Sequence, residues 1–209
     1  MTNSPHTVSD LMTHTAIAVG SDASYKEIVQ LMNQWKVSAL PVLAGEGRVI
    51  GVVSEADLLP KEENRPDRGS ASGHPLADPA KADAVCAEQL MSSPAITVHA
   101  DAPIGEAARI MARRQVKRLP VVDGVGLLEG VVSRGDLLKV FLRSDEEIAG
   151  EATTVISQLP DAADLQVRVA DGVVTLEGRL ADRALVPLVA RAVRAVEGVV
   201  DIRLDLRQG

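Results

Sequence analysis

The sequence contains few aromatic residues. Tyr25, Trp35 and Phe141 are the three rings among 209 residues, although 46% of the residues are hydrophobic. The core must therefore be built from Val, Leu, Ile, Ala and Met. Platforms that stack the bases of single-stranded nucleic acid need several exposed rings, so the composition argues against that class of protein.

Cysteine is also scarce, since Cys86 is the single one in the chain. One cysteine excludes an internal disulfide framework and a multi-cysteine zinc site. The four histidines show no metal-ligand spacing with Cys86, Asp or Glu, so no metal site is predicted. No stretch approaches the roughly 20 apolar residues of a spanning helix, and the first residues lack the basic and apolar regions of a secretory signal. These absences predict a cytoplasmic protein.

Positive charge is outnumbered, with 22 Lys plus Arg against 29 Asp plus Glu and a net charge of −7. A chain that coats nucleic acid or an anionic membrane needs a basic footprint, so the charge argues against a protein built mainly to coat either of them, and nucleic acid is not an expected partner. Sequence motifs for catalysis are missing as well: there is no Gly-rich phosphate loop and no nucleophile elbow. We therefore predict no catalytic residues and a protein that is not an enzyme.

An internal repeat is the most informative feature that is present. Residues 11–60 align without a gap on residues 90–139, with 22 identities in 50 positions. The segments GVVSEADLL (51–59) and GVVSRGDLL (130–138) agree at seven of nine positions. Such agreement shows a duplicated unit of roughly 55 residues.

Each copy is predicted to be strand, helix, strand, strand, helix. In the first copy, Ala16–Val19 is a short apolar run, and Ser24 with Glu27 forms a capping box at the start of a helix. The runs 39–43 and 49–53 are typical of a hairpin. In the second copy, Asp101 is the predicted helix cap, with Pro103 in the first turn. Between the copies, residues 61–85 are rich in Pro, Gly, Ser and charge and are predicted to be a flexible linker.

The paired Leu-Pro-Val and Gly-Val-Val-Ser-x-x-Asp motifs resemble tandem cystathionine-β-synthase-type (CBS) domains. The resemblance covers residues 8–143, with the first domain at 8–60 and the second at 86–143. It implies an α+β fold in which the copies pack as a pseudo-twofold pair, and a homodimer built through that pair. It also implies the binding of an adenine nucleotide (AMP, ADP or ATP) or of S-adenosylmethionine as a regulatory ligand, with no obligatory cofactor.

The residues implied to bind that ligand follow from the matched motifs. Asp57 and Asp136 match the ribose-binding aspartate, and Ser54 and Ser133 match its neighbouring hydroxyl residue. Other positions match the lining of the cleft or the edge of the first strand, where backbone groups meet adenine: Ser38, Ala39, Lys117, Arg118, Ala16, Ile17, Ala18, Ala95, Ile96 and Thr97. A structural explanation of Ser-x-x-Asp is also open, because this pattern begins helices.

Five cations between Arg109 and Arg118 make the two copies unequal in charge. Cations near the end of a helix complement its dipole, which explains Arg109 and Arg113. Arg118 and Arg134 lie next to motif positions, whereas their counterparts in the first copy are Ala39 and Glu55. We expect the better anion site where Arg118 and Arg134 converge; the sequence leaves open which aspartate serves that cleft.

The remaining segment, residues 146–207, predicts a small α-β-β-α-β domain. A helix precedes two strands joined at Asp171-Gly172, the strongest short hairpin signal. DGVVTLEGRL followed by VRAVEGVVDIRL resembles the BON domain, a bacterial module associated with phospholipid or other hydrophobic surfaces. Residues 145–209 carry 12 acidic and 7 basic side chains, which would repel anionic lipid, so a protein partner is equally open.

The sequence thus favours a regulatory protein in which the repeat pair senses a nucleotide and the C-terminal domain is the output or interaction module. The alternative is a structural adaptor, in which the pair only dimerises and the C-terminal domain binds phospholipid or envelope components. A small enzyme that uses the cleft is a third hypothesis, which no sequence motif supports.

Overall fold

The computed structural model describes residues 6–63, 81, 83–159, 164–180 and 182–206. The chain divides into two compact units, one of residues 7–134 and one of His6 with residues 135–206. Most of the predicted linker, residues 64–80 and 82, lies outside the described residues. Within the described parts of the chain, no helix is long and apolar enough to cross a bilayer.

Two copies of one three-stranded sheet make up the 7–134 unit. The first strand of each sheet runs parallel to the second, and the second is antiparallel to the third. Both hairpins shift register at equivalent positions, after Val42 in one copy and after Val121 in the other. The strands are β1 (Val19–Gly20), β2 (Ala39–Ala44), β3 (Arg48–Ser54), β4 (Val98–His99), β5 (Arg118–Val122) and β6 (Leu128–Ser133). The structure therefore confirms the predicted pair of repeats.

The main helix of each copy begins at equivalent positions. Ser24 caps α2 (Tyr25–Trp35), with its Oγ accepting from the Glu27 N–H at 3.3 Å, as predicted. In the second copy the cap is Pro103 and α7 is Ile104–Arg114, so the predicted cap at Asp101 is wrong. The repeat explains the difference, because Pro103 is the counterpart of Ser24. The extended backbone of the cap residue is the same in both copies, but Pro103 has no side chain that can accept a hydrogen bond.

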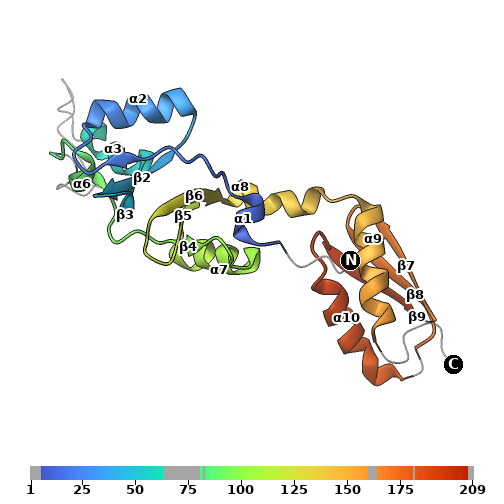
Figure 1. The fold of residues 1–209 in the computed structure, drawn as a ribbon. Helices are drawn as coiled ribbons and strands as arrows, with labels where there is room; N and C mark the ends of the chain where they lie inside the picture. Colours follow the sequence, from blue (N-terminus) through green and yellow to red (C-terminus); the bar gives the residue numbers. More distant parts are fainter. Residues whose placement is uncertain (1–5, 64–80, 82, 160–163, 181, 207–209) are drawn as a thin grey trace. The chain divides into compact units, whose positions relative to one another are not determined.

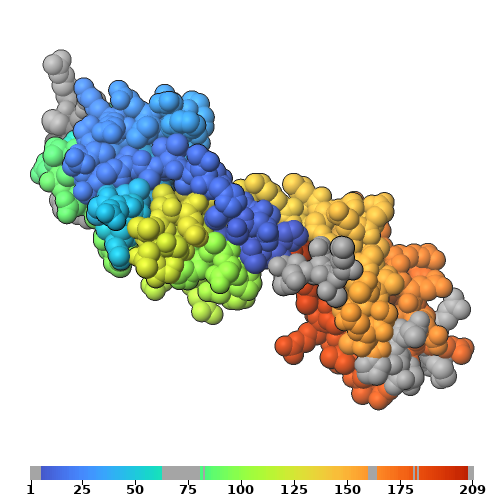
Figure 2. Space-filling model, in the orientation of Figure 1, coloured from blue at the N-terminus to red at the C-terminus, as the bar shows by residue number. Residues whose placement is uncertain are grey.

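The helix that precedes each copy packs on the other copy (Figure 1). The amide of Val8 donates to the Ala102 carbonyl at 2.9 Å, and the amide of Ala87 donates to the Ala23 carbonyl at 2.9 Å. These two helices are α1 (Val8–Leu11) and α6 (Ala87–Leu90). Ala87 and Leu90 are fully buried in the core of the first copy. The copies thus complete each other, and in the space-filling view their surfaces form one continuous body (Figure 2).

Short helices follow the third strand of each copy. In the first copy, α3 (Glu55–Leu58) starts directly after β3 and is followed by α4 (Pro60–Glu63). In the second copy, α8 (Arg134–Leu137) leads into the 3₁₀ helix η1 (Leu138–Leu142). The Ser-x-x-Asp pattern therefore does begin a helix, as the structural explanation requires.

The 135–206 unit has the predicted α-β-β-α-β order. Its elements are α9 (Asp145–Ser157), β7 (Leu165–Ala170), β8 (Val173–Gly178), η2 (Arg183–Leu185), α10 (Val186–Arg194) and β9 (Asp201–Leu206). β8 lies between β7 and β9, antiparallel to the first and parallel to the second. Ile148 of α9, Leu176 of β8 and Val193 of α10 share one buried core, so both helices cover the same face of the sheet (Figure 1).

The hairpin between β7 and β8 turns at Asp171 and Gly172, as the sequence predicts. Both residues have positive φ, 52° and 71°, which a two-residue hairpin turn of this type requires. The carboxylate of Asp145, in the first turn of α9, accepts the amides of both turn residues at 2.9 Å each. One side chain therefore fastens the helix to the hairpin.

A candidate ligand cleft between the two copies

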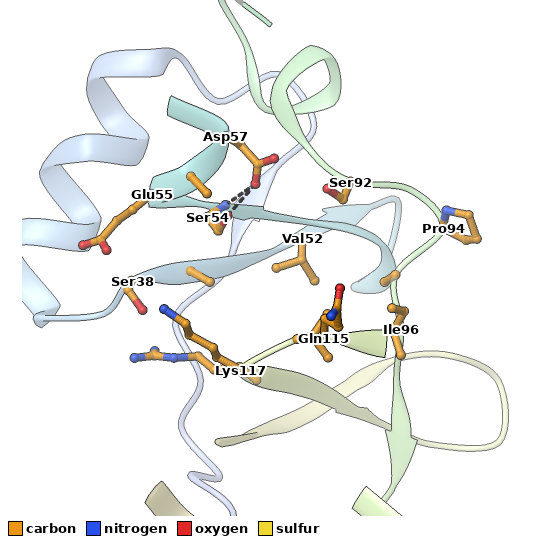
Figure 3. A pocket seen from close by; sticks show the side chains of 15 residues that line it. Ser38, Val52, Ser54, Glu55, Asp57, Ser92, Pro94, Ile96, Gln115 and Lys117 are labelled. Atoms are coloured by element: carbon orange, nitrogen blue, oxygen red, sulfur yellow. Dashed lines mark hydrogen bonds between the residues drawn. The ribbon is translucent and has the colours of Figure 1, made fainter. Parts of the chain in front are cut away.

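A cleft of about 300 Å³ lies between the two copies within the 7–134 unit (Figure 3). This volume is at the lower end of the range for small-molecule sites. The first copy supplies Ser38, Ala39, Val52, Ser54, Glu55, Ala56 and Asp57. The second copy and the segment before it supply Ser92, Pro94, Ala95, Ile96, Gln115, Val116, Lys117 and Arg118.

A fixed carboxylate stands on one side of the cleft. Asp57 is the third residue of α3, and only 9% of its surface is exposed. Its Oδ2 accepts hydrogen bonds from the backbone N–H of Ser54 at 2.8 Å and from the Ser54 hydroxyl at 2.7 Å (Figure 3). Its Oδ1 accepts from the ammonium of Lys81. The capping box therefore orients the carboxylate, and Lys81, from the segment that joins the two copies, neutralises its charge.

Two cations come from the opposite copy. Helix α7 ends at Gln115, whose left-handed backbone (φ 55°) turns the chain toward β5. Lys117 and Arg118 follow this turn and line the cleft. Figure 3 shows Lys117 reaching toward the end of the cleft where Ser38 and Glu55 lie. An anionic group bound there would face two cations, while the Glu55 carboxylate would oppose it.

The rest of the cleft is apolar. The backbones of Val52 and Ser92 exchange two hydrogen bonds, of 3.1 and 2.9 Å, which bring the segment after Ser92 alongside β3. Pro94 and Ile96 then face Val52 across the hollow (Figure 3). No aromatic ring is among the described residues that line this cleft. A flat apolar group would be held there by aliphatic contacts and by backbone hydrogen bonds.

The structure brings together eight of the residues that the sequence singled out. They are Ser38, Ala39, Ser54, Asp57, Ala95, Ile96, Lys117 and Arg118. The packing also answers which aspartate shares a cleft with Lys117 and Arg118, because Asp57 of the first copy does so. Ala95 and Ile96 lie just before β4 rather than within it.

Seven predicted residues do not line this cleft: Ala16, Ile17, Ala18, Thr97, Ser133, Arg134 and Asp136. Arg118 lines this cleft and Arg134 does not. The Nε of Arg134 donates to the Val116 carbonyl at 3.3 Å, and the convergence of the two arginines on an anion stays a prediction. Asp136 belongs to the 135–206 unit, and the Nζ of Lys139 lies 2.8 Å from its carboxylate. A ligand-binding role for these residues stays a prediction.

Sequence reasoning missed part of the lining. The sequence predicts Glu55 as a charge that opposes a phosphate in the first copy; in the structure it lies in the same cleft as Lys117 and Arg118. Val52 lies within the Gly-Val-Val-Ser motif without being one of its predicted ligand residues, and Gln115 belongs to no motif. Both line the cleft because the two copies meet there. Among the residues that the structure describes, no group of three His, Cys, Asp or Glu side chains is placed to hold a metal ion.

Comparison with known proteins agrees with this arrangement. The CBS domain model matches residues 8–62 and 87–143, more than half of the chain. The chain belongs to the CBS domain family. A BON domain model matches residues 144–208, so the CBS pair is followed by a BON domain.

Individual relatives cover the CBS pair. The protein MJ1426 of Methanocaldococcus jannaschii is 28% identical over 153 residues, which are 65% of this chain and 90% of the relative. The Arabidopsis thaliana protein CBSX2, whose crystal structure is a complex with AMP, is 27% identical with a TM-score of 0.56 and covers 66% of this chain and 97% of its own. The CBS domain pair of MJ0100, solved with 5′-methylthioadenosine and S-adenosyl-L-methionine, shares the fold at 20% identity and a TM-score of 0.54, over 66% of this chain and 97% of its own.

Proposed function

We propose that the CBS pair is a non-catalytic sensor that binds an adenine nucleotide in the cleft between its two copies. Asp57 and Ser54 would receive the ribose, the wall of Val52, Pro94 and Ile96 would contact the adenine, and Lys117 with Arg118 would face the phosphate. A ligand that binds one arrangement of the two copies more tightly would shift the conformational equilibrium toward it, and this would change the conformation that is presented to a partner.

The observation that carries this proposal is the composition of one cleft. It joins an oriented, almost buried carboxylate from one copy to two cations from the other, across an apolar wall. A carboxylate accepts from both hydroxyls of a ribose in other nucleotide folds, and cations favour phosphate. The AMP complex of CBSX2, a relative at 27% identity, supports the same ligand class.

Isothermal titration of the full chain with AMP, ADP, ATP and S-adenosylmethionine tests the proposal. We expect a saturable signal for at least one of them, and a loss of about tenfold or more in affinity for Asp57→Asn, because a buried acceptor of the ribose is changed to a group that also donates. Asp136→Asn is the matched variant and is expected to affect affinity less. Absence of heat and of any thermal shift at millimolar ligand would reject a sensor function.

The BON domain is proposed to be the output or interaction module. In β7 and β9, most of the exposed residues are polar or charged, among them Arg168, Arg203 and Asp205. Burying these charges against a lipid or other apolar surface would cost free energy, so a protein partner is favoured. Co-sedimentation of the full chain with neutral and anionic vesicles tests the adaptor hypothesis: vesicle binding that is unaffected by any nucleotide would favour the adaptor.

The homodimer implied by the family is a further prediction, which light scattering of the purified chain would test.

A further inference from the structure

The Asp57 carboxylate already has three hydrogen-bond donors in the described structure. Two come from Ser54, through its backbone N–H and its hydroxyl, and the third is the ammonium of Lys81. An ionised carboxylate offers about four acceptor positions, so one is left among these contacts. A ribose diol brings two donors. One of the present donors must therefore leave before both hydroxyls can bind.

Lys81 is the donor that can leave at least cost. The Ser54 N–H and the Ser54 hydroxyl both belong to the capping box that begins α3, so the release of either one would break that box. The Lys81 ammonium, by contrast, regains water when it is released, because its side chain is already 19% exposed. Lys81 itself is not among the residues that line the cleft, so it approaches Asp57 from outside the ligand volume.

The chain that follows Lys81 is attached to the first copy. The Ala84 N–H donates to the Lys81 carbonyl at 3.3 Å, and the Ala84 carbonyl accepts from the Lys61 ammonium at 2.8 Å. The Val85 carbonyl accepts from the Tyr25 N–H at 3.0 Å. The cation on Asp57 therefore sits at the end of a segment that leads directly into α6, the helix shared between the copies.

We propose that Lys81 competes with the ribose of the ligand for Asp57, and that its displacement loosens the segment around Ala84 that leads into the second copy. The inference rests on the proposed nucleotide site and adds the group that regulates it. Binding and the state of the segment are then linked, so whatever weakens the Lys81–Asp57 contact strengthens ligand binding.

The test is the affinity of the full chain for AMP in Lys81→Met, which keeps the length of the side chain and removes its charge. We expect AMP to bind about threefold to tenfold more tightly, the range of a partly exposed ion pair. Lys81→Arg is expected to bind like the unmodified chain. Lys61→Met is the matched control, because Lys61 holds the same segment through Ala84 and lies 5.4 Å from the centre of the Tyr25 ring, without a bond to Asp57.

Two further measurements keep the result interpretable. A 2′,3′-dideoxy analogue of AMP lacks the diol, so Lys81→Met should leave its affinity unchanged. In the unmodified chain, saturating AMP should speed hydrogen exchange at the Ala84 amide, which does not depend on how a variant folds. Equal or weaker AMP binding by Lys81→Met, or slower exchange at Ala84, would overturn the competition while leaving the nucleotide site intact. Failure of AMP and the other adenine ligands to bind either chain would overturn the proposed function, and this inference with it.

Discussion

Replacement of Gly130 by alanine should destabilise the CBS pair more than the same change at its counterpart, Gly51. Both glycines begin the Gly-Val-Val-Ser motif, and each meets the segment that crosses from the other copy. A Cβ at Gly130 would lie 2.7 Å from the carbonyl oxygen of Thr13, a backbone atom. A Cβ at Gly51 would lie 2.3 Å from the Sδ of Met91 and 3.0 Å from the carbonyl oxygen of Ser92.

The size of each effect depends on what can move. The Thr13 carbonyl accepts from the Val131 N–H at 3.1 Å, and the Thr13 N–H donates to the Val131 carbonyl at 2.9 Å. Relief of the clash at Gly130 would therefore stretch two hydrogen bonds between the copies, whereas Met91 can change rotamer. Overpacking costs about 1–3 kcal/mol, offset by about 0.4–1 kcal/mol from the stiffer unfolded chain. We expect net losses of about 2 kcal/mol for Gly130→Ala and about 1 kcal/mol for Gly51→Ala.

Chemical denaturation of the full chain, followed by circular dichroism, measures both changes. Gly124→Ala is the control, because a Cβ there meets nothing within 4 Å. In a double-mutant cycle, Met91→Ala should recover part of the loss in Gly51→Ala, since it removes the closest atoms. If Gly130→Ala is as stable as Gly124→Ala, the crossing segments do not pack against Gly130 as described.

Three other changes have definite expected outcomes. Glu55→Gln should tighten AMP by about threefold to tenfold and leave adenosine unaffected, because only the phosphate is repelled by this carboxylate; equal effects on both ligands in titration would contradict that placement. Asp145→Ala should destabilise the BON domain by about 1–3 kcal/mol through the loss of its two amide bonds, with Glu146→Ala, in the same helical turn, as the control in thermal melts. Hydrogen bonds from backbone amides, first that of Leu127, lower the pKa of Asp123 below its ordinary value of 3.8. The stabilisation from this carboxylate is therefore complete above pH 3.8 and is lost as the pH falls through the folded-state pKa. The free energy of unfolding of Asp123→Asn, measured by denaturation, should thus be lower than that of the unmodified chain at neutral pH and equal to it in acid.

Local sequence was sufficient for most elements of the fold. The helix cap at Ser24, the hairpin at Asp171-Gly172 and the order of elements in the BON domain are confirmed, because each depends on residues close together in the chain. The duplicated motifs identified the family, and the family implied the cleft residues of each copy. The predicted cap at Asp101 is wrong because Pro103 occupies the cap position without a capping side chain, while Asp101 is the nearest carboxylate before it in sequence.

The composition of the cleft was decided by tertiary structure. From sequence alone, Asp57 and Asp136 are equivalent, and so are Ser54 and Ser133, since the repeat gives both copies the same motif. The packing of the two copies against each other places Lys117 and Arg118 in one cleft with Asp57. Hydrophobic periodicity fixes which face of an element is buried, but not which distant element buries it.

The contact between Lys81 and Asp57 also depends on tertiary structure and is not determined by local sequence. The sequence by itself determined two CBS repeats, an aliphatic core, a BON domain and an aspartate with a serine at the start of a helix. Lys81 stands 24 residues after Asp57, in a stretch whose composition is that of a linker, and no local pattern connects the two. Their contact arises because the segment before α6 must return to the first copy to bury Ala87 and Leu90, and that return is a property of the folded chain.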